Sequence, residues 1–137
     1  MIEPKPLIVC DIDGTLANTI AMYSLAMKLV YGVDVLPENW TSYDLNGSIN
    51  LHDIMHDKDI LRRLPPFTET IDVINQAYNL GYPVIICTDR EPELKKLTYR
   101  WLKTYGVQFH DLRVGKGNKE YLSQIHNSQN PMFLIDY

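Results

Sequence analysis

The chain has 137 residues, carries a formal charge of -4 at pH 7, and is 45% hydrophobic and 22% charged. This length and composition are typical of one globular domain, and the acidic balance excludes a general attraction to nucleic acid or anionic membranes, although a local basic pocket can still bind a nucleotide. The sequence has no apolar run near the ~20 residues that cross a bilayer and begins without a secretory signal, so we expect a cytoplasmic protein without membrane contacts.

Short apolar runs alternate with helical patterns along the chain. Residues 7–10 (LIVC) and 83–87 (PVIIC) are typical of strands buried on both faces, because they are almost wholly apolar and polar residues follow them. Two further strands are predicted at residues 112–114 and 132–135. Capping signals such as Asn18, Thr68 and Gly32, together with the spacing of apolar residues, predict helices over residues 19–31, 51–64, 68–80, 92–105 and 119–126.

The alternation of strands and helices predicts an α/β fold, a Rossmann-like three-layer sandwich in which helices cover both faces of a parallel sheet. Residues 1–137 are expected to form a single domain. The stretch of residues 17–64 is much longer than a normal link from a strand to a helix, and its residues 33–50 have the composition of a loop. We therefore expect residues 17–64 to form a small helical cap inserted after the first strand.

Several weaker patterns have structural explanations. Cys10 and Cys87 each end an apolar run and are expected to be reduced core thiols, and Trp101 and Tyr105 have the spacing of core residues on a helix. The two histidines of HDIMH (residues 52–56) have the spacing of a zinc-binding helix, but the polar neighbourhood favours a solvated helix face. Aromatic residues near the insertion form either its small core, which we favour, or a surface on which a base stacks: Trp40, Tyr43 and Phe67.

Asp11 and Asp13 follow the first predicted strand within the sequence DIDGT (residues 11–15). Two carboxylates two residues apart repel each other unless a cation lies between them or one is protonated. Their hard oxygen atoms favour Mg²⁺, whereas the glycine comes too early for a calcium-binding loop. Ligands of open α/β sheets bind at the carboxyl ends of the strands, where Thr88 and Asp136 are also expected.

DIDGT after an apolar strand resembles the first motif of the haloacid dehalogenase superfamily of phosphotransferases, and the resemblance extends in motif order over nearly the whole chain apart from the insertion. It implies that Asp11 is a nucleophile that takes the phosphoryl group as an aspartyl phosphate. It also implies that Asp13 protonates the leaving oxygen and later activates water. A metal-held carboxylate suits the first role, and a neighbour that can hold a proton suits the second.

The second motif of the family resembles IICTDR (residues 85–90). The resemblance implies that Thr88, Asp89 and Arg90 bind the phosphate, through the Thr88 hydroxyl, nearby backbone N–H groups and the Arg90 guanidinium. A helix-capping role for Thr88 and a solvent-facing Arg90 remain open alternatives at this point.

The remaining motifs resemble GKGNKEYLSQI (residues 115–125) and FLIDY (residues 133–137). The first implies a lysine that neutralises charge on the nucleophile and the phosphate, and Lys119 is preferred to Lys116 because it opens the apolar pattern of a helix. The second implies that Asp136 binds Mg²⁺ together with Asp11 and Asp13. Tyr137 stands where relatives often have a second aspartate.

The resemblance implies a Mg²⁺-dependent phosphomonoesterase. Residues 82–91 and 97–109 are similar to the 5′(3′)-deoxyribonucleotidases, and Thr-Asp-Arg with a short cap is similar to polynucleotide 3′-phosphatase domains. The expected partner is therefore a small-molecule phosphate ester, in the first place a nucleotide, or a nucleic-acid 3′ end. The alternatives are a phosphatase for another ester, such as a sugar phosphate, and a binding module whose catalysis has lapsed. A homodimer is also left open.

Overall fold

The computed structural model describes residues 5–32, 34, 57–126 and 131–136, and they contain one sheet of four parallel strands. The strands lie in the order β3-β2-β1-β4, so β1 occupies an interior position. This arrangement confirms the predicted parallel α/β sheet. The bounds of the strands are β1 Leu7–Cys10, β2 Val84–Thr88, β3 Asp111–Val114 and β4 Met132–Ile135.

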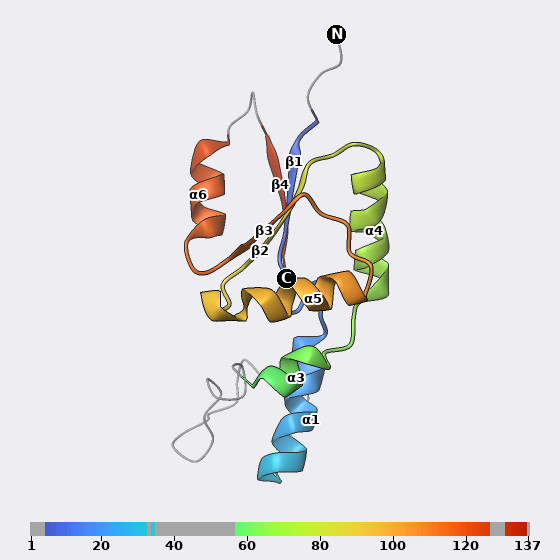
Figure 1. Cartoon of the computed structure of the whole chain (residues 1–137), viewed down its shortest axis with the longest axis vertical. Helices are drawn as coiled ribbons and strands as arrows, with labels where there is room; N and C mark the ends of the chain where they lie inside the picture. The colour runs from blue at the N-terminus through green and yellow to red at the C-terminus, as the bar shows by residue number, and fades with distance from the viewer. Residues whose placement is uncertain (1–4, 33, 35–56, 127–130, 137) are drawn as a thin grey trace.

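Helices connect the strands and cover the sheet (Figure 1). The helix α1 leaves the end of β1 and lies beside α3, beyond the sheet, whereas α4, α5 and α6 flank the strands. The described residues contain no helix long and apolar enough to span a membrane. The bounds of the helices are α1 Thr19–Tyr31, α3 Lys58–Arg62, α4 Thr68–Asn79, the 3₁₀ turn η2 Pro92–Leu94, α5 Lys95–Thr104 and α6 Asn118–Ile125.

Alternate residues of β1 point to opposite faces of the sheet and belong to two different cores. Ile8 and Cys10 pack in the larger core, which includes residues of α4 and α5. Leu7 and Val9 pack in a smaller core with Leu122 of α6. Both faces of the strand are therefore covered, which explains its wholly apolar sequence and confirms the predicted three-layer sandwich.

The caps of α1 agree with the sequence, but the start of α4 does not. The side chain of Asn18 accepts a hydrogen bond from the Ala21 amide at 3.3 Å, and Gly32 closes α1 in the left-handed conformation. The N-cap of α4 is Phe67 and not Thr68. The Phe67 amide donates to the Leu16 carbonyl at 2.8 Å, which holds the chain extended up to Phe67, so that Thr68 is already the first helical residue.

The prediction that Trp101 and Tyr105 are both core residues is right for Trp101 alone. Trp101 is buried and its indole N–H donates to the Leu64 carbonyl at 2.9 Å. Tyr105 is 37% exposed, because α5 ends at Thr104 and Tyr105 already follows the helix. Cys10 and Cys87 are free and buried, as predicted.

The helix predicted over residues 51–64 is described from residue 57 onward, where α3 covers Lys58–Arg62. The remaining residues of that prediction, with the HDIMH sequence, lie outside the described residues, as do Trp40 and Tyr43. The assignment of residues 17–64 as a cap therefore stays a prediction, to which α1 and α3 contribute the described part.

The packing of β2 gives a direct test of the core. Val84 is fully buried, whereas Val73 on α4 is 57% exposed. Val84→Ala is expected to lower the free energy of unfolding by about 2 to 3 kcal/mol, because it removes buried methyl groups and leaves a cavity. Val73→Ala, the same change at an exposed helix position, is expected to change it by less than about 0.5 kcal/mol. Urea unfolding measures both, and equal losses would contradict this view of the core.

Candidate active site

The register of the central strands brings two aspartates together. Cys10 of β1 pairs with Ile135 of β4, and the next residues along the two strands are Asp11 and Asp136. The Asp11 amide donates to the Ile135 carbonyl at 2.9 Å, which extends the pairing to the carboxyl edge of the sheet. Two residues that are 125 positions apart in the sequence are therefore neighbours, because both of them directly follow parallel strands.

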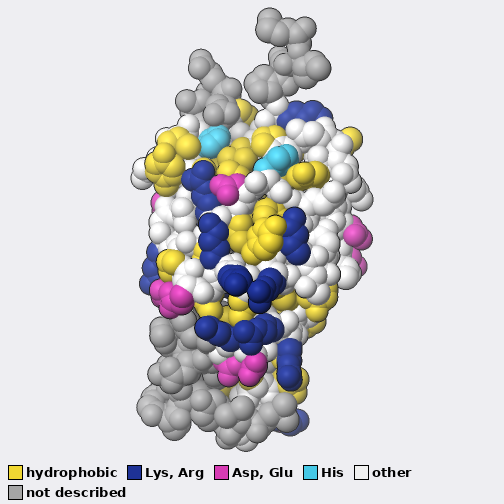
Figure 2. All heavy atoms as spheres, in the orientation of Figure 1, with side chains coloured by type: hydrophobic (Ala, Val, Ile, Leu, Met, Phe, Trp, Pro, Cys, Tyr) yellow, Lys and Arg dark blue, Asp and Glu magenta, His cyan; other side chains and the backbone are white. Residues whose placement is uncertain are grey.

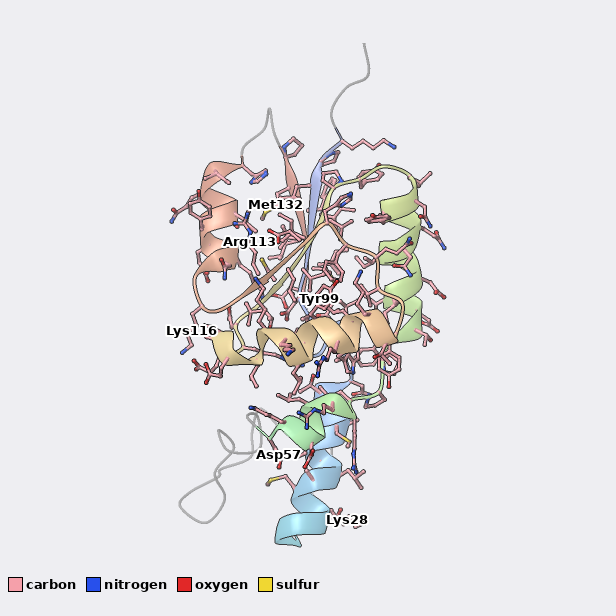
Figure 3. The ribbon with its side chains drawn as sticks, in the orientation of Figure 1. Lys28, Asp57, Tyr99, Arg113, Lys116 and Met132 are labelled. Carbon is pink, nitrogen blue, oxygen red and sulfur yellow. The ribbon has the colours of Figure 1, made fainter. Side chains whose placement is uncertain are left out.

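Lys119 lies between these two carboxylates. Its ammonium nitrogen is 3.1 Å from an Asp11 oxygen and 3.5 Å from an Asp136 oxygen, and its side chain is only 17% exposed. Lys119 is in the first turn of α6, which Gly117 begins in a left-handed conformation that favours glycine. Lys116, the alternative from the sequence, is exposed in the loop before α6, at the outer edge of the molecule (Figure 3).

The single positive charge of Lys119 does not fully neutralise the two carboxylates of Asp11 and Asp136. Burial, together with a hydrogen bond to Asp136, raises the pKa of Asp11 to about 6, although the Lys119 ammonium acts in the opposite direction. Burial alone would lower the pKa of Lys119, but its hydrogen bond to Asp11 and the charges of Asp11 and Asp136 raise it. The lysine therefore stays charged and stabilises the carboxylates only in part.

Asp13 belongs to a second ion pair. Both of its carboxylate oxygens accept hydrogen bonds from Arg90, at 2.7 and 2.9 Å, and one also accepts from the Thr19 hydroxyl at 2.7 Å. Burial by itself raises the pKa of Asp13, but the hydrogen bonds and charge of Arg90, with Thr19, outweigh it and hold this pKa below its ordinary value. The two aspartates of DIDGT are thus neutralised separately, by different cations.

Arg90 is a buried residue, so the alternative of a solvent-facing arginine is wrong. Besides Asp13, its guanidinium donates to the Thr98 hydroxyl of α5 at 3.1 Å. Its backbone amide donates to the Thr88 hydroxyl at 3.2 Å, and this hydrogen bond stabilises the turn after β2. Thr88 is buried at the end of β2, whereas the Asp89 side chain is exposed.

A hollow lies against the last two residues of the DIDGT motif, Gly14 and Thr15. The hollow, of about 570 Å³, is bordered by Gly14, Thr15 and the start of α4. The Thr15 hydroxyl is fully buried, and it finds no hydrogen-bond partner among the described residues. Gly14, which borders this hollow, has a φ of +81° that would strain any residue with a side chain.

Sequence reasoning missed Thr19 and Thr98, the two hydroxyl residues that hold the Asp13–Arg90 pair. Thr19 is the first residue of α1 and Thr98 lies in the middle of α5, and both are buried. Neither position carries a local signal beyond helical pattern. Their function depends on how the two helices are placed against the loop after β1, which the sequence does not state.

The residues at the carboxyl edge fit a divalent cation in part. Asp11 and Asp136 provide two adjacent carboxylates, and Mg²⁺ in proteins uses one or two carboxylates with water and substrate phosphates. The third predicted ligand, Asp13, has both carboxylate oxygens bound to Arg90. Consistent with this, the described residues contain no cluster of three acidic, His or Cys side chains placed to hold a metal.

The raised pKa of Asp11 can be measured directly. In metal-free protein, carbon-13 NMR titration of the Asp11 carboxyl is expected to give a midpoint near pH 6, against an ordinary value of 3.8. Because the folded state holds this proton more tightly than the unfolded chain, the stability that it contributes is full below about pH 3.8 and is lost as the pH rises through about 6. Lys119→Met should move the midpoint higher, and a midpoint near 3.8 would contradict the burial of this carboxyl.

Two arginine–aspartate pairs, one largely buried at the carboxyl edge of the sheet and one partly exposed on β3, provide a matched comparison. Arg90→Ala leaves the largely buried Asp13 without its cation and is expected to lower the free energy of unfolding by about 3 kcal/mol. Arg113→Ala removes the partner of the half-exposed Asp111 and should cost less than about 1 kcal/mol. Urea unfolding at neutral pH measures both variants. Similar small losses would show that Asp13 is solvated and not held by Arg90.

Comparisons with known proteins place this fold. No protein-family model and no curated protein matches the sequence. The structure is similar to a chain of the Pnkp1/Rnl/Hen1 RNA repair complex, with a TM-score of 0.57 and 21% identity over 97% of this chain and 36% of that one. It is similar to the class C acid phosphatase from Bacillus anthracis, with a TM-score of 0.58 and 18% identity over 92% of this chain and 50% of that one.

A third similar structure is the putative HAD-hydrolase YfnB from Bacillus subtilis, in a form bound to magnesium. Its TM-score is 0.58, with 13% identity over 96% of this chain and 79% of that one. The chain spans about a third of the length of the RNA repair chain and half of the acid phosphatase. The described residues have the fold of the haloacid dehalogenase hydrolases, as the motifs predict.

Proposed function

We propose that the protein is a Mg²⁺-dependent phosphomonoesterase that works through an aspartyl phosphate on Asp11. The observation that carries the proposal is the position of Lys119, within 3.5 Å of both Asp11 and Asp136 at the carboxyl edge of the sheet. A buried cation beside two carboxylates leaves one of them available as a nucleophile and provides charge for a phosphate that arrives there. The names of the similar structures, an acid phosphatase and a HAD-hydrolase among them, support the same reaction class.

Asp11 is the proposed nucleophile. With a pKa of about 6 it is mostly ionised at neutral pH, and its low exposure keeps it from being fully hydrated. One of its oxygens attacks phosphorus while the bond from phosphorus to the ester oxygen breaks. Lys119 stabilises the negative charge of the phosphoryl group during this transfer.

Asp13 is the proposed acid and base. It gives a proton to the departing ester oxygen in the first step. In the second step it takes a proton from water, the water oxygen attacks phosphorus, and the bond between phosphorus and Asp11 breaks to release phosphate and the free carboxylate. The first step requires that Asp13 hold a proton, which its pairing with Arg90 opposes.

Competition for Arg90 resolves this difficulty. A phosphate bound beside Thr88 would attract the Arg90 guanidinium. The Thr88 hydroxyl already accepts a hydrogen bond from the Arg90 backbone amide, so both residues belong to the same turn. When Arg90 moves to the phosphate, Asp13 loses its two hydrogen bonds and can take up a proton. Arg90 would then link the arrival of substrate to the protonation of Asp13. Its hydrogen bond to the Thr98 hydroxyl anchors it to α5.

Asp11 and Asp136 would hold the Mg²⁺ ion. The carboxylate of Asp13, also predicted as a ligand, is bound to Arg90 and would not hold the ion while it carries the proton of the first step. The ion would supply positive charge for the phosphate and for these carboxylates. Tyr137, where relatives often have another aspartate, lies outside the described residues.

The proposed substrate is a nucleotide or a nucleic-acid 3′-phosphate. The similarity to a chain of an RNA repair complex supports this class, as do the Thr-Asp-Arg sequence and the short proposed cap of residues 17–64. The cap elements α1 and α3 stand beyond the carboxyl edge of the sheet, on the side from which a substrate enters.

The test is phosphate release from a panel of esters, with Mg²⁺ or with EDTA. The panel contains 5′- and 3′-nucleoside monophosphates, a 3′-phosphorylated oligonucleotide and sugar phosphates. Asp11→Asn is expected to lower the rate at least about 1,000-fold, because the amide is not a nucleophile, and Lys119→Met about 100-fold. Lys116→Met is the matched control and should keep most of the activity.

The outcomes separate the alternatives. Release that depends on Mg²⁺ and is lost in Asp11→Asn supports the proposal, and the preferred ester identifies the substrate. A preference for sugar phosphates would reject the nucleotide substrate and keep the reaction. No release with any ester, from folded protein that binds Mg²⁺, would indicate a binding module.

A further inference from the structure

A cavity of about 430 Å³ lies between α3 and α5, and its lining contains none of the residues of the candidate active site. Four of its lining residues are cations: Lys58 and Arg62 from α3, and Lys96 and Arg100 from α5. In Figure 2, Lys and Arg side chains gather over these two helices. We call this cavity the basic groove.

The charges of the basic groove are arranged in two rows. Lys58 and Arg62 are four residues apart on one helix, and Lys96 and Arg100 are four residues apart on the other, so each pair lies on one helix face. Like charges at this spacing destabilise a helix unless an anion neutralises them. Two such rows, on helices that pack against each other, create a strip of positive potential on a chain whose formal charge is -4.

Few carboxylates balance these cations. Glu93 is the one acidic residue among those that line the groove. Arg62 is 3.2 Å from Asp59, but both side chains are more than half exposed, so the pair is weak. Lys96 and Arg100 form no ion pair with any other residue in the described part of the chain. The groove therefore keeps a net positive charge that can attract an anion.

An aromatic wall distinguishes this groove from a plain basic patch. Trp101 and Tyr105 line it, with ring centroids 4.8 Å apart. Trp101 is buried and fixed by its hydrogen bond to the Leu64 carbonyl, whereas Tyr105 is 37% exposed. Cations that follow a backbone together with an exposed ring on which a base can stack are typical of sites for single-stranded nucleic acid.

The helix α5 lies between the basic groove and the candidate active site, and its different faces carry residues that belong to each. Thr98, which holds Arg90, is two residues from both Lys96 and Arg100, so it lies on nearly the opposite face of the helix. A helix with its side chains is about 10 Å across. Glu93 lines the groove only three residues after Arg90, so the N-terminal end of α5 is where the groove and the site come closest in the chain.

We propose that the basic groove binds the backbone of a single-stranded nucleic acid whose 3′ end enters the candidate active site around the N-terminal end of α5. This inference rests on the proposed function for the identity of the end, but the groove itself can be tested without turnover. On this proposal, Lys96, Arg100 and Tyr105 select the substrate. A strand contacts them while its end lies in the candidate active site, whereas a mononucleotide is too short to contact both the groove and the site.

The experiment measures binding of a fluorescent single-stranded oligonucleotide with a 3′-hydroxyl, by anisotropy over a range of salt concentrations. The variant is the double change Lys96→Ala and Arg100→Ala. The matched control is Lys95→Ala with Lys103→Ala, which removes the same charge from the same helix at positions outside the groove. The groove variant is expected to bind at least about tenfold more weakly, with a slope of log affinity against log salt that is smaller by about 2.

A second variant tests the aromatic wall. Tyr105→Ser is expected to weaken oligonucleotide binding about tenfold and leave the salt slope unchanged, because it removes stacking and no charge. A polyglutamate peptide serves as competitor. If it displaces the oligonucleotide at equal charge concentration, and Tyr105→Ser has no effect, the groove recognises acidic chains in general and the proposal of a nucleic-acid site is overturned.

Hydrolysis of a small ester, para-nitrophenyl phosphate, separates this inference from the proposed function. If the groove variant and the control bind the oligonucleotide equally, the inference fails, even when both hydrolyse the small ester. If the wild type hydrolyses no ester but the groove variant alone loses oligonucleotide binding, the proposed function fails and the groove stands. Circular dichroism of each variant confirms that it is folded.

Discussion

The balance of buried charge at the carboxyl edge of the sheet is the constraint on which the rest of this structure depends. Parallel strands with wholly apolar sequences end together, and the residues that follow them, Asp11 and Asp136, are forced side by side. Carboxylates in such a place need cations, and the fold provides them on separate elements: Lys119 from α6 and Arg90 from the turn after β2. The placement of α6 and of the turn after β2 against the sheet is thus also the placement of the charges.

The separate neutralisation of the two motif aspartates has a chemical consequence. Asp11, beside Asp136, keeps a raised pKa and a surplus of negative charge, whereas Asp13 is held ionised by Arg90 and Thr19. Groups of the same chemical type are therefore different in proton affinity because of their partners. This difference is opposite to the one that the proposed roles require, because the proposed nucleophile, Asp11, has the raised pKa and the proposed acid, Asp13, has the lowered one. Under the proposed function, Arg90 would therefore be the residue through which a bound phosphate allows Asp13 to take up a proton.

Positive charge is distributed unevenly over the described surface. The chain is acidic as a whole, yet four cations line the groove between α3 and α5, close to an exposed tyrosine. The residues of α5 divide among three surroundings, since Thr98 faces the Arg90 pair, Trp101 contributes to the core, and Lys96 with Arg100 faces the groove. One amphipathic helix can therefore position the site and present a surface beside it, because its faces are independent of one another.

Local patterns were enough to predict the strands, the parallel sheet, most helix bounds and the residues at the strand ends. Each of these follows from short-range rules, such as apolar runs, capping side chains and the meeting of parallel strands at one edge. The sequence could not assign partners. It preferred Lys119 to Lys116 without excluding Lys116, was compatible with either a buried or an exposed Arg90, and carried no signal for Thr19, Thr98 or the basic groove. These depend on which face of one helix meets which loop, at distances of tens of residues along the chain.

What the sequence determined by itself is therefore the elements and their chemistry at the carboxyl edge of the sheet. Only the tertiary structure decided which cation neutralises which carboxylate, because that choice is made by packing between elements and not within them.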